Sequence, residues 1–253
     1  MPNKPHKPQR KPQSGGSLAG GILKTLLAEL RAADKPANRV NYQQFFKEKL
    51  ENPVGLRTSV LRQISSKVWT LVKPLSKDAI LEVCEGLLAS HQRYMRFFAS
   101  EWAGKIAPKC EPTDFARFER WLDQYVASWA DCDGLCCGVI GVLVARFPEL
   151  AAKTKRWARS RNMWRRRAAA VSLVVPARRG MLIQEVLATA EVLLADSEDL
   201  VQKGYGWMLK EAGAKSFPEV REFVMAHKDE MPRTALRYAI EKWPAAARKE
   251  AMS

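Results

Sequence analysis

Apolar residues spaced three or four apart recur in segment after segment of this 253-residue chain, and this spacing limits the folds open to it. The first such segment places Leu18, Ile22, Leu26 and Leu30 on one face of a helix. No segment alternates apolar and polar residues for long enough to indicate a strand. We therefore predict an all-α fold.

Prolines, glycines and capping residues divide this pattern into segments. Ser17 is expected to cap the first helix, and Thr113 to cap the first helix after a loop at residues 107–112 that separates two halves of the chain. The segment at residues 76–102 is expected to form one long helix or two joined near Ser90. The other expected helices cover residues 17–33, 42–50, 54–72, 114–127, 133–147, 148–159, 163–174, 181–194, 197–212, 218–227 and 232–243.

The later helices also repeat in pairs. Arg167-Ala168, Lys203-Gly204 and Arg233-Thr234 each place a basic and then a small residue near the start of a helix, at separations of 36 and 30 residues. A period of about 30 to 47 residues is typical of HEAT-type solenoids, whose curvature creates a concave surface. We predict a HEAT-like helical-repeat solenoid with a basic concave surface. The alternative is an ordinary helical bundle with accidental spacing.

Residues 1–16 differ from the rest, with four basic residues among prolines and glycines, and are interpreted as a flexible basic tail. Residues 17–253 are interpreted as a single domain. Of the net charge of +15, +11 remains when those four charges are removed, so the folded part is itself basic. This indicates a polyanionic partner, either nucleic acid or an anionic membrane. No apolar run approaches the ~18 residues of a membrane span, and we expect no membrane association.

Basic residues are densest from Arg146 to Arg167, where nine of them face a single acid, Glu149. This imbalance is interpreted as too one-sided for internal salt bridges. It favours binding to DNA phosphates over a merely solvated face. The residues assigned to DNA contact are Arg161, Arg165 and Arg166, together with Lys203.

The chain has five cysteines, an odd number that argues against a disulfide framework and fits a reducing cytoplasm, in a bacterium near the nucleoid. Cys132, Cys136 and Cys137 lie close together, but the three histidines are distant in sequence and no second cysteine pair completes a zinc site. We expect no metal and no cofactor.

The first candidate site residues lie in a stretch expected to be helical. Trp129 and Asp133 stand four residues apart and would share one face of a helix, pairing an aromatic ring with a carboxylate. Arg167 and Trp207 are assigned to the same site. Each has a plainer interpretation: the tryptophans as core residues, Asp133 as a helix cap, Arg167 as one more exposed arginine. Asp131 competes with Asp133 as the acid, but does not share the face of Trp129.

Four sequence motifs, in this order along the chain, resemble those of a known protein family. They are Ser128-Trp129 with Asp133, Phe147-Pro148-Glu149-Leu150, Trp157 with residues 162–169 (NMWRRRAA), and residues 201–209 (VQKGYGWML). The pattern resembles the AlkD-like DNA alkylation-repair glycosylases, most strongly over residues 113–243. The resemblance implies a HEAT-like fold that excises alkylated purines such as 7-methylguanine and 3-methyladenine from duplex DNA. It implies that Asp133, Trp129, Trp207 and Arg167 form the catalytic site. Tyr205, Trp157 and Trp164 are assigned to packing.

The residue types fit this chemistry. Alkylation at N3 or N7 makes the purine cationic, so the base can leave without protonation and one carboxylate suffices. Asp133 would stabilise the oxocarbenium-like sugar, the two indoles would pack against it, and Arg167 would hold a flanking phosphate. We expect a monomeric, monofunctional DNA glycosylase. The alternatives are a non-catalytic DNA-binding module and a protein-interaction scaffold.

Overall fold

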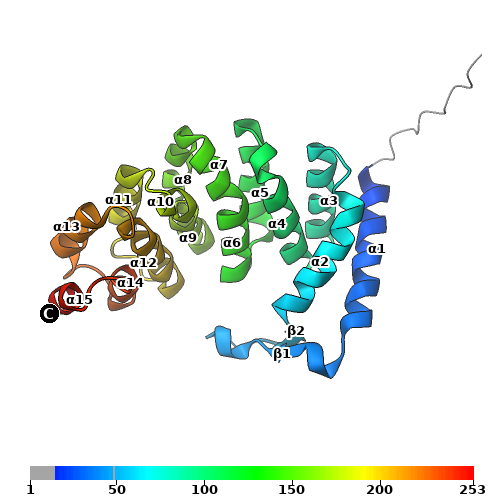
Figure 1. Cartoon of the computed structure of the whole chain (residues 1–253), viewed down its shortest axis with the longest axis horizontal. Coiled ribbons are helices and arrows are strands. Elements are labelled where there is room, and N and C mark those ends of the chain that lie inside the picture. Colours follow the sequence, from blue (N-terminus) through cyan, green and yellow to red (C-terminus); the bar gives the residue numbers. More distant parts are fainter. Residues whose placement is uncertain (1–14, 48) are drawn as a thin grey trace, which may run out of the picture. The chain divides into compact units, whose positions relative to one another are not determined.

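The structure is a computed structural model that describes residues 15–47 and 49–253. It contains two compact units, one ending at Ala99 and one running from Ser100 to Ser253. Nearly all regular structure is helical, as predicted (Figure 1). The predicted tail lies outside the described residues, except that Gly15 and Gly16 belong to the first helix. The helix therefore begins before Ser17, and the expected cap at Ser17 is wrong. The prediction of one domain over residues 17–253 stays a prediction.

The first unit contains α1 (Gly15–Ala33), α2 (Thr58–Val72), α3 (Lys77–Ala89) and the start of α4 (Met95–Ile106). Helix α1 packs against both α2 and α3. Its apolar positions behave as the spacing predicts, because Leu26 is fully buried and Leu30 nearly so. The two partner helices contribute buried residues of their own, Val68 from α2 and Leu81 from α3, so each helix supplies an apolar face to this core.

A short hairpin replaces the helix that the sequence predicts at residues 42–50. Strands β1 (Arg39–Asn41) and β2 (Val54–Leu56) pair antiparallel, and the 3₁₀ turns η1 (Pro36–Asn38) and η2 (Gln43–Phe45) flank β1. The Tyr42 backbone N–H donates to the Pro53 carbonyl at 2.7 Å, and the Gln43 side chain bonds nearby backbone groups. Three-residue strands are too short to show a period of two, so the sequence pattern missed them.

Helices α3 and α4 are separate, which confirms the two-helix alternative for residues 76–102. Between them His91 and Tyr94 adopt left-handed backbone conformations, with φ of 51° and 71°. Helical geometry cannot continue through such residues. The boundary between the two units falls within α4, before the loop at residues 107–112.

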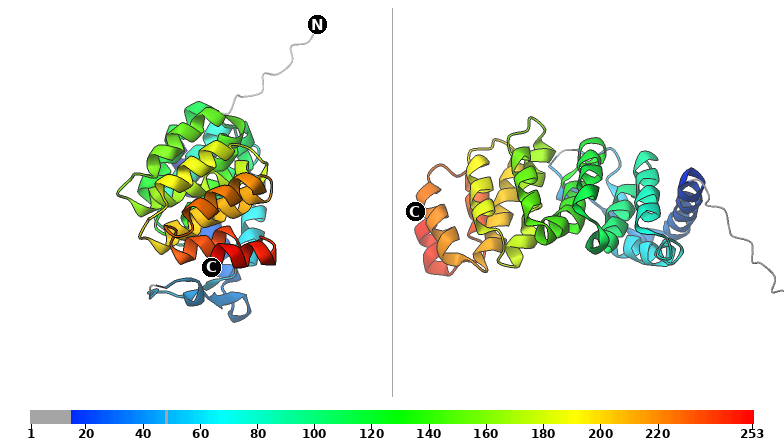
Figure 2. Two further views of the ribbon diagram at one scale, coloured as in Figure 1. Left: turned by 90° about the vertical axis from the view of Figure 1, so that its left-hand side faces the viewer. Right: turned by 90° about the horizontal axis from the view of Figure 1, so that it is seen from above.

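The second unit is a succession of short helices (Figure 2). The predicted helices are all present with shifted ends, but two short helices, at residues 174–178 and 245–252, were not predicted. Thr113 is no helix cap, because it lies inside η4 and α5 begins at Phe115. The elements are η3 (Ala107–Lys109), η4 (Pro112–Asp114), α5 (Phe115–Tyr125), α6 (Trp129–Leu135), the π-helical turn η5 (Cys136–Ile140), α7 (Gly141–Arg146), η6 (Pro148–Leu150), α8 (Ala151–Trp157), α9 (Met163–Val171), α10 (Val174–Arg178), α11 (Ile183–Val192), α12 (Asp199–Gly213), α13 (Phe217–His227), α14 (Arg233–Ala239) and α15 (Ala245–Met252).

The predicted repeat is visible in the packing of α12 against both α9 and α14 (Figure 1). These three helices carry the three basic-small dipeptides. Gly206 lets α12 approach α14, since a Cβ there would lie 2.6 Å from both the Ala235 carbonyl oxygen and the Tyr238 Cβ. The all-α, repeat-type fold is thus confirmed. The basic concave surface stays a prediction.

Two further findings concern the described residues only. No helix there is both long enough and apolar enough to span a membrane. All five cysteines, which lie in this part of the chain, are free thiols.

Candidate active site

Helix α6 positions Asp133 in its interior. The N-cap residue of α6 is Ser128. The Ser128 Oγ accepts a hydrogen bond from the Asp131 N–H at 3.2 Å and donates one to Asp131 Oδ2 at 2.9 Å. Asp131 Oδ2 also accepts from the Ala127 N–H at 3.3 Å. Asp131 therefore serves the helix terminus, and the interpretation of Asp133 as a cap is wrong. The Asp133 side chain, one turn after Trp129, is left for another role.

The partner of Asp133 is Arg167, which comes from α9. Arg167 Nε donates to Asp133 Oδ1 at 2.9 Å and Nη2 donates to Oδ2 at 2.8 Å, a two-pronged pair. Its Nη1 donates to the Leu200 carbonyl at the start of α12. Gly204 makes room for this side chain, because a Cβ there would lie 3.4 Å from Arg167 Cγ. The structure thus unites three of the four motifs.

Burial of this pair is unequal. The Arg167 side chain is 6% exposed, so the interpretation of an exposed arginine is wrong, while that of Asp133 is 20% exposed. Burial raises the pKa of Asp133, and although the bonds and charge of Arg167 oppose this, the pKa stays above its ordinary value. Burial lowers the pKa of Arg167, but the bonds to Asp133 raise it, and the pKa of Arg167 is raised overall. Asp133 is a held carboxylate with one open side.

Cys136 and Cys137 follow α6 in η5, where a π-helical turn widens the helix. Cys136 is buried, and its Sγ lies 4.0 Å from that of the buried Cys132. Burial raises the pKa of the half-buried Cys137 to about 12, although the charges of Arg178 and Arg167 oppose it. This thiol therefore stays protonated at neutral pH and adds no second negative charge beside Asp133.

Neither site tryptophan belongs to the core. Trp129 and Trp207 are both only partly buried, so the core interpretation is wrong for each. Trp207 Nε1 donates to Glu211 Oε1 at 3.2 Å, and the Arg178 guanidinium lies over the Trp207 ring at 5.7 Å from its centre. Both indoles therefore keep exposed surface that a substrate can contact. Trp157 and Tyr205 are buried as expected, whereas Trp164 is half-buried.

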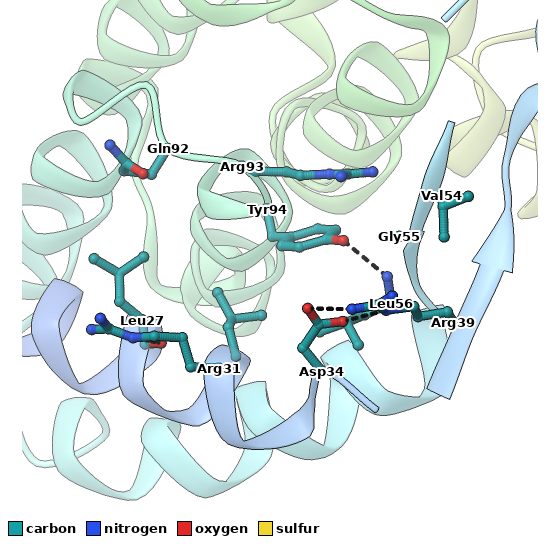
Figure 3. A pocket seen from close by; sticks show the side chains of 11 residues that line it. Leu27, Arg31, Asp34, Arg39, Val54, Gly55, Leu56, Gln92, Arg93 and Tyr94 are labelled. Atoms are coloured by element: carbon teal, nitrogen blue, oxygen red, sulfur yellow. Dashed lines mark hydrogen bonds and ion pairs between the residues drawn. The ribbon is translucent and has the colours of Figure 1, made fainter. Parts of the chain in front are cut away.

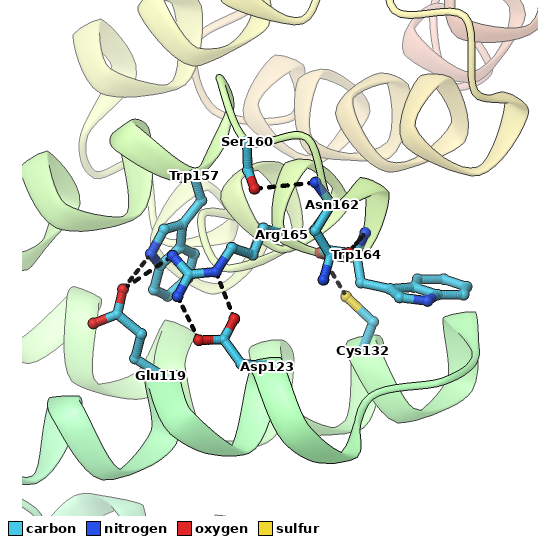
Figure 4. A network of polar contacts seen from close by, with 8 residues as sticks. All are labelled: Glu119, Asp123, Cys132, Trp157, Ser160, Asn162, Trp164 and Arg165. Atoms are coloured by element: carbon cyan, nitrogen blue, oxygen red, sulfur yellow. Dashed lines mark hydrogen bonds and ion pairs between the residues drawn. The ribbon is translucent and has the colours of Figure 1, made fainter.

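Three of the four residues assigned to DNA contact form ion pairs within the chain. Arg165 bonds Asp123 at 2.5 and 2.6 Å and reaches Glu119 at 3.3 Å (Figure 4). Arg166 bonds Asp196 at 2.6 Å, and Lys203 bonds Asp199 at 2.8 Å. The expectation that charge imbalance would exclude internal ion pairs is wrong, because most of these acids come from other segments of the chain.

Four other cations of the basic run are exposed. Arg161 is among them, with Lys153, Arg156 and Arg159 on or just after α8. In the part of the chain that the structure describes, none of these four has a carboxylate partner. We refer to these four exposed residues, which are close in sequence, as the α8 basic surface. The assigned roles of all four candidate DNA contacts stay predictions.

A family of DNA alkylation repair enzymes has a sequence model that matches residues 26–243 of this chain. The chain belongs to the DNA alkylation repair enzyme family. No curated protein matches it. One solved structure, described as a predicted DNA alkylation repair enzyme from Enterococcus faecalis, is similar with a TM-score of 0.66 and 16% sequence identity. The similarity covers 76% of this chain and 88% of that one, and it supports the fold.

Membership gives the chain an enzymatic role in DNA repair, with DNA as its partner. Sequence reasoning missed two residues beside Trp207 in this repair enzyme: Glu211 and Arg178. Glu211 is 7% exposed and also bonds Arg178 at 2.9 Å and Lys242 at 3.2 Å. Burial would raise the pKa of Glu211, but these cations hold it below its usual range. Its spacing of four from Trp207 was a usable signal, whereas nothing local marked Arg178.

Proposed function

We propose that this DNA repair enzyme is a monofunctional glycosylase that hydrolyses the N-glycosidic bond of cationic N3- or N7-alkylated purines in duplex DNA. The observation that carries the proposal is the partly exposed geometry of Asp133. Its two oxygens are fixed by Arg167, yet 20% of the side chain stays open, one helical turn from Trp129. A held carboxylate with one open side suits a reaction that develops positive charge.

The chemistry needs only this one carboxylate. The C1′–N bond breaks with its electron pair going to the cationic base, which leaves as the neutral alkylated purine. The sugar becomes oxocarbenium-like, and the Asp133 carboxylate stabilises that charge at close range. A water oxygen then bonds to C1′ and its proton passes to Asp133 or solvent. The product is an abasic site in an intact strand.

The neighbouring groups support this step. The bonds from Arg167 fix the direction of the carboxylate before the substrate arrives, so little reorganisation is needed in the transition state. The ring faces of Trp129 and Trp207 favour adjacent positive charge. The exposed cations Arg156 and Arg161 would bind phosphates. The contact of Arg167 with a flanking phosphate would use the N–H groups that bond neither Asp133 nor the Leu200 carbonyl.

The experiment is release of bases from methylated duplex DNA by the purified chain. We expect free 7-methylguanine and 3-methyladenine in the supernatant, with strand breaks only after alkali treatment. Strand breaks without alkali would show a lyase and contradict the monofunctional mechanism. Salt-sensitive DNA binding without release of these bases, or of bulkier N3 and N7 adducts, would favour a non-catalytic binding module.

A further inference from the structure

The buried carboxylate of Glu211 accepts hydrogen bonds from three donors and has no part in the bond-breaking step described above. Glu211 lies in α12. Its Oε2 accepts from Arg178 Nε at 2.9 Å, and its Oε1 accepts from Trp207 Nε1 and from Lys242 Nζ, both at 3.2 Å. These donors come from α10, from α12 itself and from the segment after α14. One buried side chain therefore fixes groups from three parts of the second unit.

A pocket in the first unit shows the opposite arrangement. Its volume is about 570 Å³, and α1, the hairpin and the turn before α4 line it (Figure 3). Arg31 and Arg93 lie at different ends of this pocket and point apart (Figure 3). Asp34 is bonded by Arg39, at 2.7 and 2.9 Å. The arginines of this pocket thus do not meet at one point, whereas three donors meet at Glu211.

Contacts through α12 connect Trp207 to the Asp133–Arg167 pair. Arg167 donates to both Asp133 oxygens and to the Leu200 carbonyl at the start of α12. The Arg167 Cγ lies against Gly204, where a Cβ would be 3.4 Å away. Trp207 follows Gly204 by three residues, so the two positions share one face of the helix. This arrangement supports a shared site for Trp207 and Asp133.

Arg178 lies close to the same site. Its guanidinium lies 5.7 Å from the centre of the Trp207 ring. Burial raises the pKa of Cys137, one turn after Asp133, to about 12, and the charges of Asp133 and Arg178 act on that thiol in opposite directions. Because Glu211 bonds both the Arg178 Nε and the Trp207 N–H, it holds the ring and the cation over it together.

The bond between Glu211 and Trp207 restricts the ring. Burial raises the pKa of Glu211, but the bonds and charges of Arg178 and Lys242 hold it below its ordinary value. Glu211 is therefore ionised at neutral pH, and it accepts the indole N–H as a charge-assisted hydrogen bond. Tryptophan has a single N–H donor, which lies in the plane of its ring. A fixed acceptor for this donor therefore selects one orientation of the ring.

We propose that Glu211 is a positioning residue of the active site, whose carboxylate sets the plane of the Trp207 ring before DNA binds. This inference rests on the proposed glycosylase function, in which the face of that ring packs against the sugar as positive charge develops. A ring already held in place needs less reorganisation in the transition state. If Glu211 only joined the three elements, its loss would lower stability and leave the rate of the folded enzyme unchanged.

The first test is single-turnover release of 7-methylguanine at saturating DNA, with thermal unfolding to show that each variant is folded. Glu211→Leu removes the acceptor, and we expect the rate to fall at least about tenfold, as loss of one charged hydrogen bond does. Glu211→Gln keeps an oxygen for the indole N–H and should lose less than about threefold. Glu119→Leu is the matched control, because Glu119 bonds the indole N–H of the core residue Trp157 at 2.8 Å, and its rate should be unchanged.

A second background separates the effect on the ring from an effect on stability. Trp207→Phe keeps an aromatic ring and has no N–H, so adding Glu211→Leu should slow this variant less than about threefold. Equal slowing by Glu211→Leu in both backgrounds overturns the proposal. A wild-type rate in the single variant Glu211→Leu also overturns it.

The indole N–H signal of Trp207 tests the positioning without catalysis. The chain has eight tryptophans, and Trp207→Phe identifies the signal of Trp207 in a proton–nitrogen NMR spectrum. We expect this signal to move and to exchange faster with water in Glu211→Leu, and to stay in place in Glu119→Leu. A Trp207 signal that is unchanged in Glu211→Leu overturns the proposal. Absence of base release by the wild type contradicts the glycosylase function instead, and the N–H signal then decides whether Glu211 positions the ring.

Discussion

At the scale of single residues, two opposing effects act on the Asp133 carboxyl. Burial favours the neutral form, and the two bonds from Arg167 favour the ionised form. The first effect is the larger, so the pKa lies above its ordinary value of 3.8. Because the proposed reaction needs the carboxylate, activity is present above this raised pKa and is lost as the pH falls through it.

A pH–rate profile tests this balance. For the wild type, we expect single-turnover base release to fall on the acidic side at a pH above that of an ordinary aspartate. In Arg167→Ala the opposing charge is gone, so the fall should move to still higher pH. Arg165→Ala removes an arginine of the same helix that bonds Asp123 instead, and should leave the fall in place. An unchanged profile in Arg167→Ala would contradict the assigned coupling.

The same pair makes a prediction about stability. Removing Arg167 leaves a mostly buried, unpaired carboxylate, and we expect the free energy of unfolding to drop by about 3 kcal/mol. Removing Asp133 as well should recover part of the lost free energy of unfolding, because the unpaired buried charge is then absent. Urea unfolding of both single variants and the double variant measures this. Strictly additive losses would mean that the two side chains are not energetically coupled.

Sequence reasoning at this scale succeeded where geometry is local. A spacing of four residues placed Trp129 and Asp133 on one face of a helix, and the cap at Ser128 fixes where that helix begins. It failed where partners are distant in sequence. The acids that bind Arg165 and Arg166 lie 42 and 30 residues away, and only the packing of the helices brings them together.

At the scale of elements, close packing of α12 on α14 depends on Gly206. Gly206→Ala puts a methyl group 2.6 Å from the Ala235 carbonyl oxygen, and that backbone cannot yield cheaply. We expect a loss of about 1 to 3 kcal/mol in unfolding free energy. Gly134→Ala is the matched control, since its Cβ meets only the Ser100 side chain, with Cβ at an ordinary 3.5 Å.

The control variant Gly134→Ala should raise the free energy of unfolding. Gly134 lies in the interior of α6, where alanine is favoured over glycine by about 0.5 to 1 kcal/mol. Chemical unfolding of both variants therefore should give changes of opposite sign. Equal small effects would contradict the close approach of α12 and α14.

Some helices and strands could be predicted from the sequence pattern, and others could not. Long amphipathic helices such as α1 and α12 were evident from period 3.6 alone. The β1–β2 hairpin was missed because its strands are three residues each, and its order comes from hydrogen bonds such as that from the Tyr42 hydroxyl to the Leu56 carbonyl at 2.6 Å. Helix α15 was missed because its eight residues bury little, with Ala251 as their one buried side chain.

At the scale of the whole molecule, the net charge of +15 predicts DNA binding that weakens steeply with salt. The structure separates the cations that can contribute from those engaged within the chain. Replacing Arg156, Arg159 and Arg161 of the α8 basic surface by glutamine should make the slope of log affinity against log salt shallower, by about 1 for each phosphate that these arginines bind. Fluorescence anisotropy at several salt concentrations measures it.

Ion-paired arginines supply the contrast. Arg165→Gln and Arg166→Gln break bonds to Asp123 and Asp196. We expect these variants to lower the free energy of unfolding, with little change in the slope of log affinity against log salt. A salt slope that falls in these two variants and not in the triple variant would mean that DNA displaces the internal ion pairs.

The catalytic role of Asp133 is tested by measuring 7-methylguanine release under single-turnover conditions for the wild type, Asp133→Asn and Asp131→Asn. The Asn side chain keeps the shape of Asp133 and removes the charge that would stabilise the oxocarbenium-like sugar. We expect a loss of at least about a hundredfold in rate with DNA binding retained, while Asp131→Asn, altered only at the cap of α6, keeps most of its rate. Release by Asp133→Asn at the wild-type rate would contradict the assignment of Asp133 as the essential carboxylate.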